Sequence, residues 1–255
     1  MLHPATPGER ERQTTDTLSL KQNPVWPWRA CYLVYPAVQV FHAKTQAKNT
    51  PMTAIAPALC WSCHSVVSAP QVTCSACGVL LPPWPLSPFA LLGLPVSVHL
   101  NTDTLTSAYL KAIAPVHPDT AARRSKKEQL FAAQHAAAVN AAYQALSNLY
   151  QRALCCYTLA GGAPFPETST DKQLLTHVLE QREALSEADT VAAIDSLVAA
   201  SAKNKVAALD RIANALDNDE PEKAVTALLW LRYEEKFSGE AEQRRKKLLQ
   251  GDMKL

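Results

Sequence analysis

Residues 101–148 read NTDTLTSAYLKAIAPVHPDTAARRSKKEQLFAAQHAAAVNAAYQALSN, a segment with the pattern of two helices joined by a short loop. Asn101, Thr102 and Asp103 can cap a helix, because short polar side chains accept hydrogen bonds from its free N–H groups. Apolar residues then recur at three- and four-residue steps, as they do along one face of a helix. They are Leu105, Tyr109, Ala112, Ile113 and Val116. We therefore predict a first helix that ends near Pro115.

A second, longer helix is predicted over about residues 125–148. Its expected apolar stripe consists of Leu130, Ala133, Ala136, Val139, Tyr143 and Leu146. Between the two helices lies His117-Pro118-Asp119-Thr120, where Pro118 prevents the helix from continuing. The helices should form an antiparallel hairpin whose tip presents an imidazole and a carboxylate to a partner. A turn with a purely structural role is the alternative.

The rest of the chain after this hairpin is also helical in pattern. A short helical stretch at residues 152–160 is stopped by Gly161-Gly162. Residues from about 170 to 249 then show three long helical patterns with few breakers, which predicts a three-helix bundle joined by short turns. No strand-like alternation of useful length occurs after Phe89. We expect an all-α fold apart from one cysteine-rich segment.

Four of the seven cysteines lie close together, as two Cys-x-x-Cys pairs with ten residues between them: Cys60, Cys63, Cys74 and Cys77. This spacing lets two tight turns offer four thiolates to one tetrahedral Zn²⁺. Gly78 follows the second pair, where a positive φ is often needed. Four protein ligands leave no position for water or substrate, so we expect one structural zinc ion. Two disulfides, four free thiols or an iron occupant are the alternatives, and ferredoxin spacings fit less well.

Residues 1–55 are rich in Pro, Thr and Gln without a sustained period, which indicates a disordered tail or a targeting segment. The basic residues of this stretch suit a mitochondrial presequence, and its acidic residues do not. The formal net charge of +2 and the lack of any Lys or Arg in residues 56–90 argue against a nucleic-acid partner. No stretch approaches the roughly 20 apolar residues that span a bilayer, so no membrane partner is expected.

The hairpin with its His117-Pro118-Asp119 loop resembles a J-domain. In that family the loop binds an Hsp70 and stimulates its ATP hydrolysis. The resemblance implies that His117, Pro118 and Asp119 bind Hsp70 together with Lys111, the one cation of the first helix, and that Asp119 pairs with a partner arginine. The chain departs from the family at Val116 and Thr120, where an aromatic and a basic residue are usual. Nearby cations can partly substitute: Arg123, Arg124, Lys126 and Lys127.

The order of segments resembles the HscB-type J-proteins of iron–sulfur cluster assembly, whose eukaryotic members carry an N-terminal tetracysteine module. The match includes Phe89-Ala-Leu-Leu-Gly-Leu-Pro95 and residues 174–187, which resemble the family's scaffold-docking helix. The scaffold-binding residues that this implies are Leu175, Thr176, Leu179, Glu180, Glu183 and Glu187, with Tyr233 on the third bundle helix. Thr176 stands where a Met is usual, which removes apolar contact.

These patterns divide the chain into a tail or targeting segment (1–55), a tetracysteine zinc module (56–82), a J-domain (87–160) and a C-terminal scaffold-binding three-helix bundle (168–250). The resemblance implies a J-type co-chaperone of the mitochondrial matrix that delivers the cluster scaffold protein to a mitochondrial Hsp70 and promotes cluster transfer. A general J-domain co-chaperone for unfolded clients is the alternative. We expect no enzyme, because no catalytic triad, phosphate loop or open metal site can be assembled.

Overall fold

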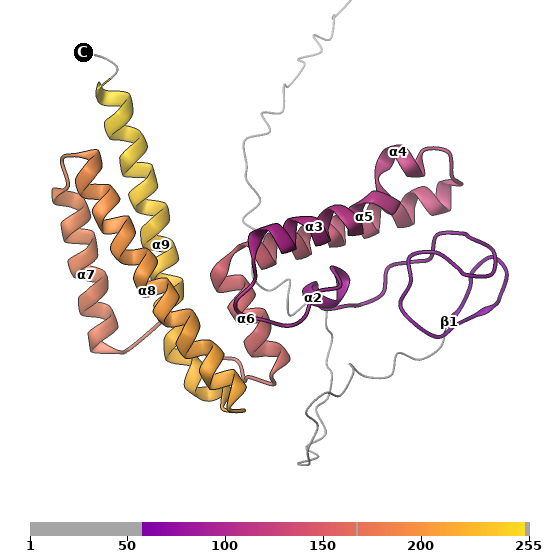
Figure 1. The fold of residues 1–255 in the computed structure, drawn as a ribbon, viewed down its shortest axis with the longest axis horizontal. Coiled ribbons are helices and arrows are strands. Elements are labelled where there is room, and N and C mark those ends of the chain that lie inside the picture. The colour runs from indigo at the N-terminus through magenta and orange to yellow at the C-terminus, as the bar shows by residue number, and fades with distance from the viewer. Residues whose placement is uncertain (1–57, 167, 253–255) are drawn as a thin grey trace, which may run out of the picture. The chain divides into compact units, whose positions relative to one another are not determined.

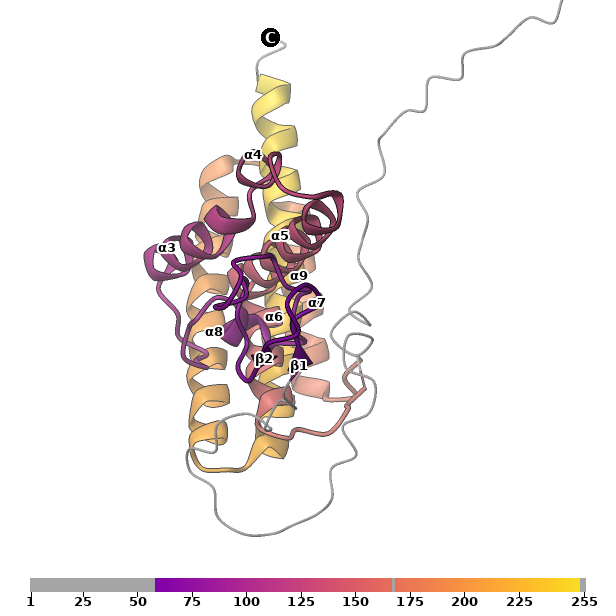
Figure 2. The same cartoon turned by 90° about the vertical axis from the view of Figure 1, so that its right-hand side faces the viewer.

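A computed structural model describes residues 58–166 and 168–252, all within one compact unit, and they are mostly helical (Figures 1 and 2). The expected tail at residues 1–55, including Cys31, lies outside the described residues. The all-α prediction is confirmed, since the strands of the described ranges are the two-residue β1 (Ala58–Leu59) and β2 (Val66–Val67), which pair antiparallel. None of the described helices is long and apolar enough to cross a membrane.

The predicted hairpin consists of α3 (Thr102–Ile113) and α5 (Lys126–Ser147), which lie side by side in Figure 1. The side chain of Asn101 caps α3 as expected, accepting a backbone N–H at 2.7 Å. Tyr109 and Tyr143 pack across the two helices with ring centroids 4.5 Å apart. Aromatic contacts of this kind add to the apolar burial that holds the helices together.

The tip of the hairpin is more ordered than a simple loop. A 3₁₀ turn, η1 (Ala114–Val116), ends the first helix, and a short helix, α4 (Pro118–Ala121), follows His117. Pro118 opens α4, a position that suits proline because its missing N–H would have no partner there. The Asp119 N–H donates to Nδ1 of His117 at 3.3 Å, so the imidazole caps the turn that carries the carboxylate.

The buried face of α5 differs from the predicted stripe. Leu130 is 56% exposed and Ala133 is also exposed. The buried positions are instead Glu128, Ala132, His135, Val139, Ala142 and Leu146. A prediction from periodicity places only apolar residues in the core. Glu128 and His135 are nevertheless buried, because they have hydrogen-bond partners in the cysteine segment.

The three long helices of the predicted bundle are α7 (Lys172–Glu187), α8 (Val191–Asp217) and α9 (Pro221–Asp252). They lie side by side in Figures 1 and 2. Asp171 and Thr190 cap the N-termini of α7 and α8 with their side chains. The short turns between the helices place consecutive helices antiparallel, as the sequence predicts.

The hairpin and the bundle share one apolar core. It also includes α2 (Pro88–Leu91), which contributes Phe89, and α6 (Leu149–Leu159). Cys155 and Cys156 of α6 are buried, and burial raises the pKa of Cys156 to about 12, which keeps its thiol protonated. Other fully buried members are Leu146, Ala153, Ile212, Ala224, Leu228 and Leu231.

A buried carboxylate, Glu234 of α9, anchors the middle of α7. It accepts hydrogen bonds from His177 at 2.8 Å and Gln181 at 3.0 Å on α7. Ser201 at 2.5 Å and Asn204 at 2.9 Å donate from α8. Burial by itself would raise the pKa of Glu234, but these hydrogen bonds outweigh it and lower the pKa. The three bundle helices therefore meet at one ionised group.

We predict that Glu234→Ala lowers the free energy of unfolding by about 3–5 kcal/mol, because one buried and three half-buried donors lose their acceptor. Urea unfolding followed by circular dichroism measures this loss. The matched control is Glu183→Ala on the exposed face of α7, which should change stability by no more than about 0.5 kcal/mol. Similar stability for the two variants would contradict the anchoring role.

Candidate functional site

The four cysteines of the predicted zinc module converge. Sγ of Cys60 lies 3.8 Å from Sγ of Cys77, and Sγ of Cys63 lies 3.7 Å from Sγ of Cys74. All four sulfurs lie within 4.8 Å of one another. Thiolates bound tetrahedrally at about 2.3 Å from Zn²⁺ are separated from each other by about 3.8 Å. The residues present therefore fit a four-thiolate metal site, and bound zinc would close it to water and substrate.

The two cysteine pairs form turns with the same backbone pattern. The N–H of Cys60 bonds to the carbonyl of Ser65, and the N–H of Cys74 bonds in the same way to Val79, both at 2.9 Å. The residue after each pair takes a left-handed conformation, with φ of 59° at His64 and 73° at Gly78. The positive φ expected at Gly78 is confirmed, and His64 occupies the equivalent backbone position without joining the sulfur cluster.

The crowded thiols favour a bound cation. Hydrogen bonding to Ser65 holds the pKa of the Cys63 thiol at about 6. A backbone hydrogen bond with Val79 favours ionisation of Cys77, but contact with Cys63, burial and the other thiols prevail and raise the pKa of Cys77 to about 12. Because one thiolate suppresses ionisation of its neighbours, all four can ionise together only when positive charge is bound among them.

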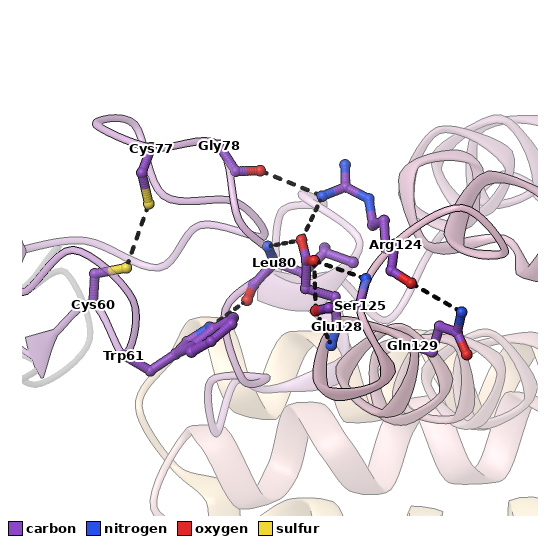
Figure 3. Close-up of polar contacts among 9 residues, drawn as sticks. All are labelled: Cys60, Trp61, Cys77, Gly78, Leu80, Arg124, Ser125, Glu128 and Gln129. Carbon is purple, nitrogen blue, oxygen red and sulfur yellow. Dashed lines mark hydrogen bonds and ion pairs between the residues drawn. The ribbon is translucent and has the colours of Figure 1, made fainter.

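The cysteine module is hydrogen-bonded to the start of α5, as Figure 3 shows. Leu80 donates its N–H to Oε1 of Glu128 at 3.2 Å and accepts from Nε1 of Trp61 at 2.8 Å. Nη1 of Arg124 bonds to the Gly78 carbonyl at 3.3 Å and to Oε1 of Glu128 at 3.0 Å. The same carboxylate thus receives hydrogen bonds from the module and from the hairpin.

Glu128 also completes the helix cap of α5. Its Oε2 accepts the N–H of Ser125 at 3.1 Å and the hydroxyl at 2.7 Å. The Ser125 hydroxyl, with the Leu80 N–H and the Arg124 guanidinium, outweighs burial and lowers the pKa of Glu128 to about 2. The sequence carries a signal for this cap, because Ser-x-x-Glu before a helix is a capping box. The contact with Leu80 has no such signal.

Ring contacts extend the module's interface along α5. Trp61 meets Phe131 edge to face with centroids 6.2 Å apart, and Nζ of Lys127 lies 4.2 Å from the centre of the Trp61 ring. Burial lowers the pKa of His135 and so favours the neutral ring, and its Nε2–H donates to the Leu81 carbonyl at 2.9 Å. Sequence reasoning missed these residues because they meet across about 50 to 70 positions of chain, beyond any local periodicity.

The residues predicted to bind Hsp70 lie at the hairpin tip and on α3. The side chain of Asp119 is 92% exposed, and its Oδ2 lies 3.5 Å from Nδ1 of His117. Lys111 is exposed near the end of α3. Of the substitute cations, Arg124 and Lys127 contact the cysteine module. Arg123 and Lys126 are exposed.

The residues predicted to bind a scaffold lie mainly on the outer face of α7. Leu179 is 67% exposed, and Leu175 is also a large exposed apolar side chain. Thr176, Glu180, Glu183 and Glu187 are exposed as well. Tyr233 of α9 is half-buried and lines a small crevice with Gln181 and Arg182 of α7. The structure therefore brings Tyr233 next to the helix that carries the other residues.

Comparisons of the sequence and of the structure with known proteins all find members of one family. Residues 170–242 match a family model described as the HSCB C-terminal oligomerisation domain. The iron–sulfur cluster co-chaperone protein HscB of Homo sapiens is 31% identical over 184 residues, covering 68% of this chain and 77% of that protein. The HscB of Mus musculus is 30% identical with the same coverage. The crystal structure of human HscB superposes with a TM-score of 0.66 at 28% identity, covering 74% of this chain and 98% of that one.

A helical hairpin with an exposed His-Pro-Asp tip, packed on a three-helix bundle, defines a J-type co-chaperone. The sequence identity to the human and mouse proteins shows which family of J-type co-chaperones this is. This chain belongs to the HscB family of iron–sulfur cluster co-chaperones.

We predict that the purified protein binds one zinc ion per chain, because the sulfur positions suit a tetrahedral Zn²⁺. Cys63→Ser should lose most of the metal, since a hydroxyl is a poor zinc ligand. Cys156→Ser, which changes a buried thiol outside the cluster, should retain it. Elemental analysis after gel filtration measures zinc per chain. Stoichiometric iron, or full zinc occupancy in Cys63→Ser, would contradict the prediction.

Proposed function

We propose that this protein binds the iron–sulfur cluster scaffold protein through α7 and Tyr233, delivers it to a mitochondrial Hsp70 and stimulates Hsp70 ATP hydrolysis through the His117 loop. The single observation that carries the proposal is the exposed His117–Asp119 pair at the tip of the hairpin within an HscB-family chain. The hydrolysis takes place in the Hsp70. The role of this chain is to bind the Hsp70 and stabilise the Hsp70 conformation that hydrolyses ATP.

The electrostatics of the tip support the Hsp70 step. The Asp119 carboxylate is available to pair with an arginine of the partner, since its contact inside the chain is to the adjacent imidazole. Because the His117 ring accepts the backbone N–H of Asp119, the ring is held close to the residue that carries the carboxylate. Lys111, Arg123 and Lys126 are exposed and add positive charge that would complement an acidic partner surface.

The face of α7 supports the scaffold step. Leu175 and Leu179 are exposed at four-residue spacing, and carboxylates of Glu180 and Glu183 border them. Exposed leucines on a helix fit the apolar centre of a protein interface, and the surrounding carboxylates fit its polar rim. The inner face of the same helix is held by Glu234, so the outer face is presented by a fixed helix.

The mitochondrial matrix is proposed as the site of action. Relatives include eukaryotic HscB proteins from human, mouse and Arabidopsis thaliana, alongside bacterial homologues. The basic residues of the first 55 positions add modest support. A fluorescent fusion of the full chain, imaged with a matrix marker, tests the location.

We predict that His117→Gln abolishes stimulation of Hsp70 ATP hydrolysis, because the amide cannot reproduce the ring that caps α4 and contacts Asp119. Steady-state ATP hydrolysis by a mitochondrial Hsp70 is measured with and without scaffold protein. Wild-type chain and scaffold together should stimulate more than the sum of their separate effects. Full stimulation by His117→Gln would contradict the loop mechanism, and loss of synergy alone would favour a general co-chaperone.

We predict that Leu179→Ala combined with Glu180→Ala weakens scaffold binding at least tenfold, because an apolar anchor and an adjacent charge are both removed. Isothermal titration calorimetry with purified scaffold measures the dissociation constant. Thr176→Met should tighten binding several-fold by adding apolar contact area. The control Leu110→Ala removes a leucine of similar exposure on α3 and should bind normally. Unchanged binding by the double variant would assign the α7 face a structural role only.

A further inference from the structure

The side chain of Leu80 connects the cysteine module to both flanks of the His117 loop. It is fully buried and packs with Val116, Ala121 and Ala132. Val116 immediately precedes His117, and Ala121 is the last residue of α4. One side chain from the module therefore supports the loop on both sides of its exposed tip.

The backbone of Leu80 is in turn tied to both cysteine pairs. Leu80 lies three positions after Cys77, and its carbonyl accepts the indole N–H of Trp61 at 2.8 Å. Trp61 directly follows Cys60, so the first cysteine pair is connected to Leu80 by the hydrogen bond of the Trp61 side chain. The N–H of Leu80 donates to Glu128 at the start of α5. Displacement of either cysteine pair would therefore move the residue that supports the loop.

Within the cysteine module itself, few contacts apart from those of its thiols hold it folded. Its own buried cluster consists of Cys60, Val67, Cys74 and Leu81, and two of these are sulfur ligands. β1 and β2 are two residues long. Residues 56–90 contain no Lys, Arg, Asp or Glu, so the segment forms no internal ion pairs among such residues. Modules with so small a core commonly depend on a metal for their fold.

We propose that the metal-bound cysteine module positions the His117 loop. Metal binding holds Leu80 against Val116 and Ala121, and loss of the metal releases the loop from this support. Leu80 and Glu128 are the positioning residues, because they join the module to the loop and to α5. The structural part of this proposal stands on the contacts alone. Its consequence for Hsp70 rests on the proposed function.

The first test measures loop mobility instead of activity. Hydrogen exchange of residues 116–121 is followed by mass spectrometry in the full chain, with zinc bound and after removal by a chelator. We expect exchange to accelerate at least about tenfold on zinc removal, because local opening becomes easier. Residues 139–146, in the shared core, should keep their protection and show that the hairpin remains folded. Unchanged exchange at residues 116–121 would overturn the proposal.

The second test separates the contact from the metal. Leu80→Ala keeps all four cysteines, and with zinc bound it should show fast exchange at residues 116–121. Glu128→Gln provides an independent variant, because the amide can still cap α5 but presents only one acceptor oxygen to its donors. Leu59→Ala is the matched control, since this leucine of the same module is 65% exposed. A protected loop in zinc-bound Leu80→Ala and in Glu128→Gln would overturn the role of these residues.

The Hsp70 readout distinguishes positioning from direct contact. If the loop spends less time in the conformation that binds Hsp70, the apparent affinity for Hsp70 falls. Leu80→Ala and zinc removal should therefore raise the concentration needed for half-maximal ATPase stimulation several-fold and leave most of the maximum. His117→Gln should instead abolish the maximum. Normal stimulation by His117→Gln would refute the proposed function alone, whereas a normal half-maximal concentration for both Leu80→Ala and zinc-free protein would refute the positioning role.

Discussion

The carboxylate of Glu128 receives hydrogen bonds from two parts of the chain, and the arrangement of both depends on it. Oε1 accepts from Leu80 of the cysteine module and from Arg124, and Oε2 accepts from Ser125 at the cap of α5. A buried charge is tolerated when its hydrogen-bonding positions are filled in this way. Because the donors come from both parts, neither part can shift without removing a hydrogen bond from the buried charge.

Glu234 is a second buried carboxylate that connects separate segments, in this case the helices of the bundle. Its carboxylate joins α7 to α8 and α9 through four side-chain donors, which include His177 and Gln181 on α7. The position and rotation of α7 are restrained in this way, since sliding or turning this helix would break both of its bonds to Glu234. The leucines on the opposite face, including Leu179, consequently remain exposed. The proposed scaffold surface thus depends on a buried acid that makes no contact with a partner.

The helices were predictable because their information is local. Caps such as Asn101 and Ser125, and apolar residues at three- and four-residue steps, are read within one or two turns. The prediction was right for Val139 and Leu146 on the buried face of α5 and wrong for the first half of this face, where Glu128 and His135 replace Leu130 and Ala133. The partners that make these polar residues suitable for burial lie about 50 positions earlier, so periodicity cannot identify them.

The succession of helices, the cluster of four cysteines and the exposed His117-Pro118-Asp119 tip all followed from the amino-acid sequence, because turn chemistry, caps and ligand spacing are properties of short segments. The packing of Leu80 in one buried cluster with Val116 and Ala121, the flanks of that tip, is visible solely in the folded chain. Such a contact depends on which surfaces meet after the helices have formed, and it is selected by the burial of side chains distant in sequence. The same reason explains why Glu128 and Glu234, ordinary acids in the sequence, become buried connections between segments.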